Sequence, residues 1–187
     1  TSVYKTMRIG RTLPPAAAPL TLRDLISGVR ALMIGPGELE KRRQELRAYF
    51  GTNHCSLVSS GKAALTLILQ ALKDVHPDRD RVLIPAFACY SIPSAIARAG
   101  LTIQLCDIDP ITLDFDYDQL ANKLANPRLL CVLPIHLFGL PADIDRLKQL
   151  RRDPAVCSVE DAAQAMGGEW QGKKLGTQGD VGFFSLG

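Results

Sequence analysis

The chain has 187 residues, of which 47% are hydrophobic and 22% are charged, a composition typical of a soluble globular protein with one sizeable core. Its net charge of +3 is too small an excess to predict binding to nucleic acid. No apolar stretch approaches the roughly 20 residues of a membrane-spanning helix, and residues 1–10 lack the apolar core of a signal peptide, so we expect a cytoplasmic protein that does not enter a membrane.

The cysteines are odd in number and form no CxxC pair, and most of them lie in apolar runs. They are Cys55, Cys89, Cys106, Cys131 and Cys157. This pattern favours reduced, buried thiols over a disulfide framework. The three histidines have no metal-ligand spacing around them, so we predict no metal site.

Residues 1–34 are predicted to form an N-terminal arm followed by a first helix. The prolines at positions 14, 15 and 19 exclude a continuous helix in the arm, which could lie on a second subunit. Thr21 and Asp24 resemble a capping box that opens a helix to about residue 32. After a Gly-Pro-Gly break, a second helix is expected over 38–50, with Gly51 as its stop.

From residue 55 onward, strand-like and helix-like segments alternate. The expected strands are 55–59, 81–84, 102–106, 129–133, 155–159 and 181–185. The expected helices are 63–72, 91–99, 116–124 and 142–150, and residues 169–175 are expected to make a β-turn excursion. This order predicts an α/β protein, with a mainly parallel sheet covered by helices on both faces.

The segment 158–165 (SVEDAAQA) follows a buried strand, at the sheet edge where ligands bind in open α/β folds. We therefore expect Asp161 to be exposed to a cleft and open to a charged partner. The alternative is that Glu160 and Asp161 only begin a helical turn, where acidic residues suit the helix dipole.

A second candidate is the strand–loop–helix junction at 58–64 (VSSGKAA). The backbone N–H groups around Gly61 would form an anion site at a helix N-terminus, with phosphate as the natural occupant. The alternative is a plain tight turn. A nucleotide P-loop is excluded, because Ser56 stands where that motif needs glycine and Ala63 stands where it needs Ser or Thr.

Other strand ends carry further candidates. Phe87 is expected in the core, whereas Tyr90 could stack on a planar ligand or be buried as well. His136 follows another strand, and Asp107 and Asp109 are better explained by a turn than by a metal. A planar, phosphorylated ligand with a basic ring nitrogen would use all the candidates at this edge.

These motifs, taken in order, resemble the DegT/DnrJ/EryC1/StrS family of sugar aminotransferases, which use pyridoxal phosphate and have the aspartate aminotransferase fold (fold type I). The resemblance rests on residues 35–51, 60–65 (SGKAAL), 83–88 (LIPAFA), 136–143 (HLFGLPAD), 160–165 (EDAAQA) and 179–185 (GDVGFFS). It implies a three-layer αβα large domain over residues 35–187. The small domain of the family would be absent.

The resemblance also implies roles for individual residues. Asp161 would pair with the pyridine nitrogen of the cofactor, and Gln164 would contact its 3-oxygen. The remaining cofactor-binding residues would be the phosphate contacts Ser60, Gly61, Lys62 and Ser185, the ring-stacking position Cys89 with Tyr90 beside it, and His136. Lys62 replaces the usual threonine of the family.

The implied reaction moves an amino group from an amino acid, most simply glutamate, to a keto group on a nucleotide-linked sugar, in a homodimer. The Schiff-base lysine of the family follows the F-S motif and is expected just after Gly187, so the resemblance implies that these 187 residues are a fragment without activity of its own. The alternatives are a non-catalytic relative that acts in binding or assembly, and a dehydratase that uses the same cofactor.

Overall fold

The computed structural model describes residues 21–34 and 37–186, with the side chains of 31–34 left out. The chain divides into two compact units, residues 1–42 with 187 and residues 43–186. No helix among the described residues is both long enough and apolar enough to cross a membrane.

Two predictions fall outside the described residues. The first is the N-terminal arm, residues 1–20. The second is the end of the predicted large domain at Gly187, after which the Schiff-base lysine is expected. The structure therefore tests neither the arm nor the position of the lysine, and both stay predictions.

The first unit contains α1 (Leu22–Ile34) and the beginning of α2 (Gly37–Phe50). The predicted capping box is confirmed at the start of α1. The Thr21 N–H donates to Asp24 Oδ2 at 2.8 Å, and the Asp24 N–H donates to Thr21 Oγ1 at 3.3 Å. Each side chain thus accepts from the backbone N–H of the other residue, as in a capping box.

The second unit is built on a five-stranded sheet in the order β2-β1-β3-β4-β7, in which every neighbouring pair is parallel. Its strands are β1 (Arg81–Pro85), β2 (Thr102–Cys106), β3 (Leu129–Val132), β4 (Cys157–Asp161) and β7 (Val181–Phe183). A two-stranded antiparallel ribbon, β5 (Glu169–Trp170) with β6 (Lys173–Lys174), forms the predicted β-turn excursion.

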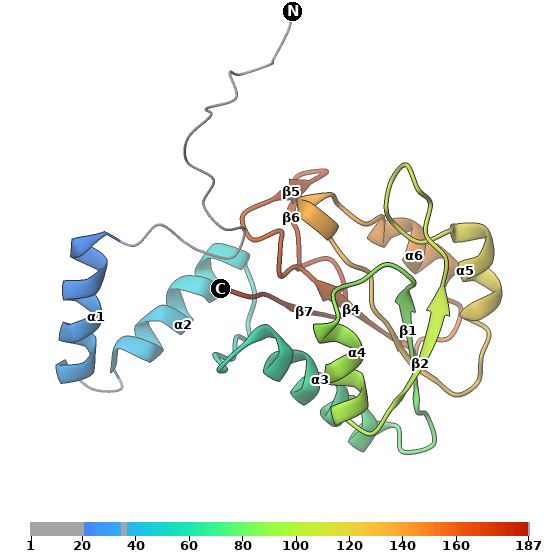
Figure 1. Cartoon of the computed structure of the whole chain (residues 1–187), viewed down its shortest axis with the longest axis horizontal. Helices are drawn as coiled ribbons and strands as arrows, with labels where there is room; N and C mark the ends of the chain where they lie inside the picture. The colour runs from blue at the N-terminus through green and yellow to red at the C-terminus, as the bar shows by residue number, and fades with distance from the viewer. Residues whose placement is uncertain (1–20, 35–36, 187) are drawn as a thin grey trace, which may run out of the picture. The chain divides into compact units, whose positions relative to one another are not determined.

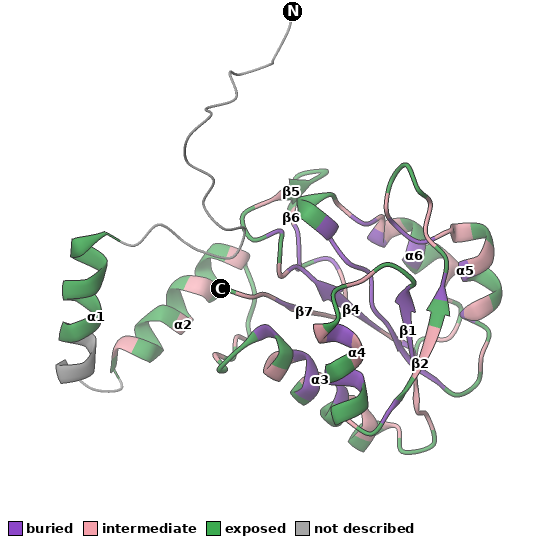
Figure 2. Ribbon diagram, in the orientation of Figure 1, coloured by how far each residue is buried: buried purple, intermediate pink, exposed green. Residues whose placement is uncertain are grey.

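Helices cover both faces of this sheet, which makes three layers (Figure 1). On one face, α3 (Gly61–Val75) and α4 (Ser91–Arg98) bury leucine and isoleucine side chains against β1, β3 and β4. On the other face, α5 (Tyr117–Lys123) and α6 (Ile144–Leu150) pack on a second apolar cluster around Phe115. The buried strands form the centre of the unit in Figure 2, so the predicted fold class is confirmed.

Three local expectations are wrong. Residues 55–59 form no strand, because no described strand lies beside them to complete a ladder. β4 continues two residues further than expected, to Asp161, where it pairs with β7. Phe87, expected in the core, is 54% exposed, since it lies in the loop after β1 and not in the strand.

Candidate functional site

Asp161 is the last residue of β4, and neighbouring segments hold it on both sides. Its N–H donates to the carbonyl of Pro134 at 2.9 Å, and its own carbonyl accepts from the N–H of His136 at 3.0 Å. On the other side it pairs with Phe183 of β7. Because strand pairing reaches this residue, Asp161 is only 7% exposed, and the expectation of an exposed carboxylate is wrong.

The Asp161 carboxyl group has unused capacity to accept hydrogen bonds. Oδ1 accepts from the N–H of Ala163 at 2.9 Å, and Oδ2 has no hydrogen bond within the described residues. Burial raises the pKa of this carboxyl group above its ordinary value, and the bond from Ala163 offsets part of that rise. A buried carboxyl group with a free oxygen is suited to bind a cationic N–H donor.

The start of α3 forms the second part of the site. The Ser60 hydroxyl accepts from the N–H of Ala63 at 3.1 Å and so caps the helix. The N–H groups of Gly61 and Lys62, in the first turn, find no partner in the described part of the chain. An uncapped pair of N–H groups at the positive end of a 15-residue helix favours an anion.

Ser185 lies directly against this helix start. A Cβ built on Gly61 would be 3.2 Å from Ser185 Cβ and 3.6 Å from its Oγ. The fold therefore brings together two predicted phosphate contacts that are far apart in the sequence, and the absence of a side chain at Gly61 leaves room for the hydroxyl. Lys62, the next residue of α3, is exposed.

Gln164 is exposed and is oriented by one hydrogen bond from the neighbouring turn. Its Oε1 accepts from the N–H of Phe138 at 2.7 Å. Because the backbone N–H can only donate, the amide oxygen must face it and the NH₂ group must face the other way. Gln164 is therefore positioned as a donor, as a contact with an anionic ring oxygen would require.

Glu160 and His136 form a fully buried pair behind this edge. His136 Nε2 lies 2.8 Å from Glu160 Oε2, and both side chains are 0% exposed. His136 Nδ1 accepts from the N–H of Ala142 at 3.0 Å, so the proton must be on Nε2, which donates to Glu160. Both ring nitrogens are engaged, which leaves none free for the direct cofactor contact that the sequence predicts for His136.

Two glycine N–H groups complete the surroundings of Glu160. Oε2 also accepts from Gly176 at 3.0 Å, and Oε1 accepts from Gly179. We call Glu160, His136, Gly176 and Gly179 the Glu160 cluster. This role of Glu160 was not predicted from the sequence, although the position of Glu160 within the EDAAQA motif was a signal.

Cys89 and Tyr90 lie in the segment after β1, at the start of α4. Tyr90 is 83% exposed, and Cys89 is exposed with its Sγ 3.2 Å from Ser91 Oγ. β1 and β4 both lie next to β3, so their carboxyl ends share one edge of the sheet. Among the described residues no hydrogen bond or ring contact joins Cys89 or Tyr90 to Asp161.

We refer to the four residues best placed by geometry, Gly61, Asp161, Gln164 and Ser185, as the strand-edge site.

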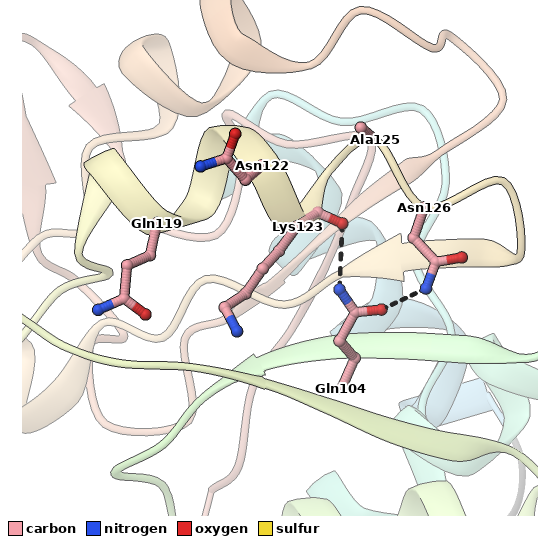
Figure 3. Close-up of a pocket in the computed structure, with 6 residues that line it drawn as sticks. All are labelled: Gln104, Gln119, Asn122, Lys123, Ala125 and Asn126. Atoms are coloured by element: carbon pink, nitrogen blue, oxygen red, sulfur yellow. Dashed lines mark hydrogen bonds between the residues drawn. The ribbon is translucent and has the colours of Figure 1, made fainter.

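A separate pocket of about 480 Å³ lies elsewhere on the unit, between the outer strand β2 and α5. Its lining residues are Gln104, Gln119, Asn122, Lys123, Ala125 and Asn126. Gln104 is held there by the Lys123 carbonyl at 3.1 Å and the Asn126 amide at 2.6 Å (Figure 3). None of the predicted site residues lines this pocket, so it is not the site described above.

The fold and the site together define an α/β protein whose sheet edge combines an anion-binding helix start, a buried acid and an amide donor. The chain belongs to the DegT/DnrJ/EryC1/StrS aminotransferase family, whose model matches residues 22–186. The predicted family is therefore confirmed.

Several curated relatives are about one third identical to this chain over the aligned residues. The 3-amino-5-hydroxybenzoate synthase of Amycolatopsis mediterranei (strain S699) is 34% identical over 153 residues, which are 82% of this chain and 39% of that protein. The dTDP-3-amino-3,4,6-trideoxy-alpha-D-glucose transaminase of Streptomyces venezuelae is 35% identical over 160 residues, 82% and 40% of the two chains. The GDP-4-keto-6-deoxy-D-mannose 3-dehydratase of Yersinia pseudotuberculosis is 30% identical over 158 residues, with the same coverage.

Solved structures agree with this assignment. The crystal structure of 3-amino-5-hydroxybenzoic acid synthase has a TM-score of 0.80 at 32% identity, over 91% of this chain and 46% of that one. The PLP-form of a proposed sugar aminotransferase from Streptococcus pneumoniae has a TM-score of 0.84 at 26% identity. The match covers 95% of this chain and 49% of that one. The chain thus spans about 40% of the curated relatives and about half of the solved ones. The family and the PLP-form support the prediction of pyridoxal phosphate as cofactor.

Proposed function

We propose that this chain forms the cofactor-binding part of a pyridoxal-phosphate-dependent aminotransferase. The observation that carries the proposal is Asp161, a buried carboxyl group at the carboxyl end of a parallel strand, one oxygen of which has no hydrogen bond from the residues that the structure describes. Such an acid suits a protonated ring nitrogen, because a buried charge needs an opposite partner. The Gly61–Ser185 approach supports a phosphate contact on the same edge.

When bound, pyridoxal phosphate supplies an electron sink for the carbanion of an amino-acid substrate. In the proposed arrangement, Asp161 accepts the N–H of the pyridine ring and keeps the proton on that nitrogen. The Gln164 NH₂ group donates to the 3-oxygen, since its own oxygen is held by Phe138. The Gly61 and Lys62 N–H groups, which have no partner among the described residues, and the Ser185 hydroxyl would hold the phosphate.

For the substrates, we propose an amino acid, glutamate in the simplest case, as the donor and a nucleotide-linked keto-sugar as the acceptor. The transaminase relative from Streptomyces venezuelae, whose name includes a dTDP-sugar, supports this class of acceptor. We further propose that the active form is a homodimer. The exposed Phe87, Tyr90 and Phe138 are candidate contacts of such a dimer, because large exposed apolar side chains tend to mark interaction surfaces.

The second candidate is a dehydratase that uses the same cofactor. It is favoured by the Yersinia pseudotuberculosis relative, which is named as a 3-dehydratase and is 30% identical to this chain. A dehydratase would remove a hydroxyl group from the sugar as water, whereas an aminotransferase would leave an amino group in place of the keto oxygen. Mass analysis of the sugar product separates these two outcomes.

The test uses protein expressed from the complete reading frame. Pyridoxal phosphate is added, the mixture is reduced with borohydride, and the modified peptide is located by mass. We expect one labelled lysine just after Gly187, and amino transfer from glutamate to a nucleotide-linked keto-sugar. The absence of a specific label would overturn the aminotransferase proposal and favour a non-catalytic relative or the dehydratase.

A further inference from the structure

We infer that Glu160 is a positioning residue for the cofactor site, although its side chain points away from the ligand that we propose. This inference rests on the proposed function. Glu160 precedes Asp161 on β4, so their side chains lie on opposite faces of the strand. Its 0% exposed carboxylate accepts from three N–H donors, His136, Gly176 and Gly179, so its oxygens are well satisfied.

The first connection leads from Glu160 to Gln164. His136, held by Glu160 and by the N–H of Ala142, begins the turn that contains Phe138. The Phe138 N–H fixes the amide of Gln164, and Phe138 itself has a φ of +55°, a conformation that an L-residue adopts only when its surroundings impose it. Glu160 therefore acts on the orientation of Gln164 through one buried side chain and one turn.

The second connection leads from Glu160 to Ser185. Gly176 and Gly179, whose N–H groups bind the carboxylate, belong to the loop that enters β7, and Ser185 follows β7 by two residues. The packing there is close: a Cβ on Gly182 of β7 would fall 2.0 Å from the Gly176 carbonyl oxygen. A shift of this loop must therefore move β7 and, with it, the Ser185 hydroxyl.

The third connection is to Asp161 itself. The His136 N–H binds the Asp161 carbonyl at 3.0 Å, so the same histidine that Glu160 anchors also holds the backbone of the acid. One buried carboxylate thus joins three of the four residues of the strand-edge site. A glutamine in its place would turn an NH₂ group toward at least one of the three N–H donors. That hydrogen bond would be lost, because an NH₂ group cannot accept it.

The test is E160Q in protein expressed from the complete reading frame, with pyridoxal phosphate affinity measured by fluorescence titration of the cofactor-free protein. We expect E160Q and Q164A each to weaken binding roughly tenfold. The double variant should lose less than the roughly hundredfold that independent effects would give, because part of the effect of E160Q runs through the Gln164 contact that Q164A already removes. E160Q should also shift the absorption maximum of the bound cofactor in the same direction as Q164A does, which a loss of stability by itself would not do.

The matched control is E169Q, at an exposed glutamate of β5 whose Oε1 lies 3.4 Å from Lys174 Nζ. We expect its affinity to stay within about twofold of wild type, as for a change at a solvated surface pair. If E160Q does not fold, H136Q serves as the second variant, because it removes only one of the three donors to Glu160. We expect H136Q also to weaken cofactor binding and to combine with Q164A less than additively.

The outcomes separate the two proposals. Wild-type protein that fails to bind pyridoxal phosphate would overturn the proposed function and this inference together. Wild-type binding with unchanged affinity in E160Q, or with fully additive effects of E160Q and Q164A, would overturn the inference and leave the proposed function standing.

Discussion

Two neighbouring carboxyl groups on β4 have opposite environments. Glu160 and Asp161 are both buried, at 0% and 7% exposure. Glu160 accepts three N–H donors from two other segments of the chain. Within the described part of the chain, the Asp161 carboxyl group accepts one hydrogen bond, from the N–H of Ala163 two residues ahead, and burial raises its pKa. The described residues therefore supply hydrogen bonds to both oxygens of Glu160 but to only one oxygen of Asp161.

This difference separates an architectural acid from a ligand-binding one. A buried carboxylate that the protein satisfies stabilises the segments around it, and the Glu160 cluster does this for the loop before β7. A buried carboxyl group with a free oxygen destabilises the folded state in its charged form, unless a ligand supplies the missing partner. On this argument the two residues should respond in opposite ways to substitution.

The largest effect is expected from a side chain at Gly176, the residue of the Glu160 cluster that packs against Phe184 and Ala162. Gly176 has a φ of +83°, and a Cβ there would be 2.4 Å from Phe184 Cζ and 2.9 Å from Ala162 Cβ. We expect Gly176→Ala to lower the free energy of unfolding by about 3 kcal/mol or more, from the left-handed backbone and the overpacking together. Chemical denaturation measures the loss.

The control for Gly176→Ala is Gly172→Ala, in the turn between β5 and β6. Gly172 has a similar φ of +75°, but a Cβ there would meet nothing within 4 Å. Its loss should be limited to the backbone contribution of about 1–2 kcal/mol. Equal losses in the two variants would show that the close packing of Gly176 against Phe184 and Ala162 adds nothing to the cost.

A smaller and two-sided effect is expected from Asp161→Asn. Removing one partner of a buried ion pair should weaken binding of pyridoxal phosphate by about 100-fold. The cofactor-free variant should nevertheless be more stable than wild type at neutral pH, because no charge is then buried. Titration of the cofactor and thermal unfolding without it measure the two effects separately.

The same variant has a definite effect on the pH dependence of stability. Since the pKa of Asp161 is raised in the folded state, the folded protein binds more protons than the unfolded one as pH rises above the ordinary aspartate value. Asp161 therefore lowers the free energy of unfolding as pH rises from the ordinary aspartate pKa to the raised pKa of the folded state. Asp161→Asn should remove this contribution to the slope of stability against pH. Asp78→Asn, at an exposed residue, should leave it in place, and an unchanged slope in Asp161→Asn would contradict the burial argument.

The smallest effect is expected at the helix cap. Ser60→Ala removes the acceptor of the Ala63 N–H and should lower the free energy of unfolding by about 1 kcal/mol. Ser59→Ala, at the exposed residue just before it, removes a hydroxyl of the same kind without a cap bond and should change stability by less than about 0.5 kcal/mol. Denaturation of both variants makes the comparison, and equal losses would remove the evidence for the cap.

Much of the fold could be predicted from sequence, because its signals are local. The alternation of apolar runs with helical segments predicts the parallel sheet, and the Thr21–Asp24 pattern predicts the start of α1 correctly. The segment 55–59 has the same apolar character as a strand, yet it forms none. Strand formation needs a neighbour to complete the hydrogen bonds, and a local pattern carries no information about that neighbour.

The candidate site divides in the same way. The order and spacing of the motifs by themselves determined the family, and Gly61, Asp161, Gln164 and Ser185 were among the nine residues that they selected. Only the tertiary structure decided that both ring nitrogens of His136 are engaged in hydrogen bonds. It also decided that the buried Glu160 carboxylate binds the segments that carry the site. The reason is that a buried polar group is defined by its partners, and those of Glu160 come from segments that the fold alone brings to β4.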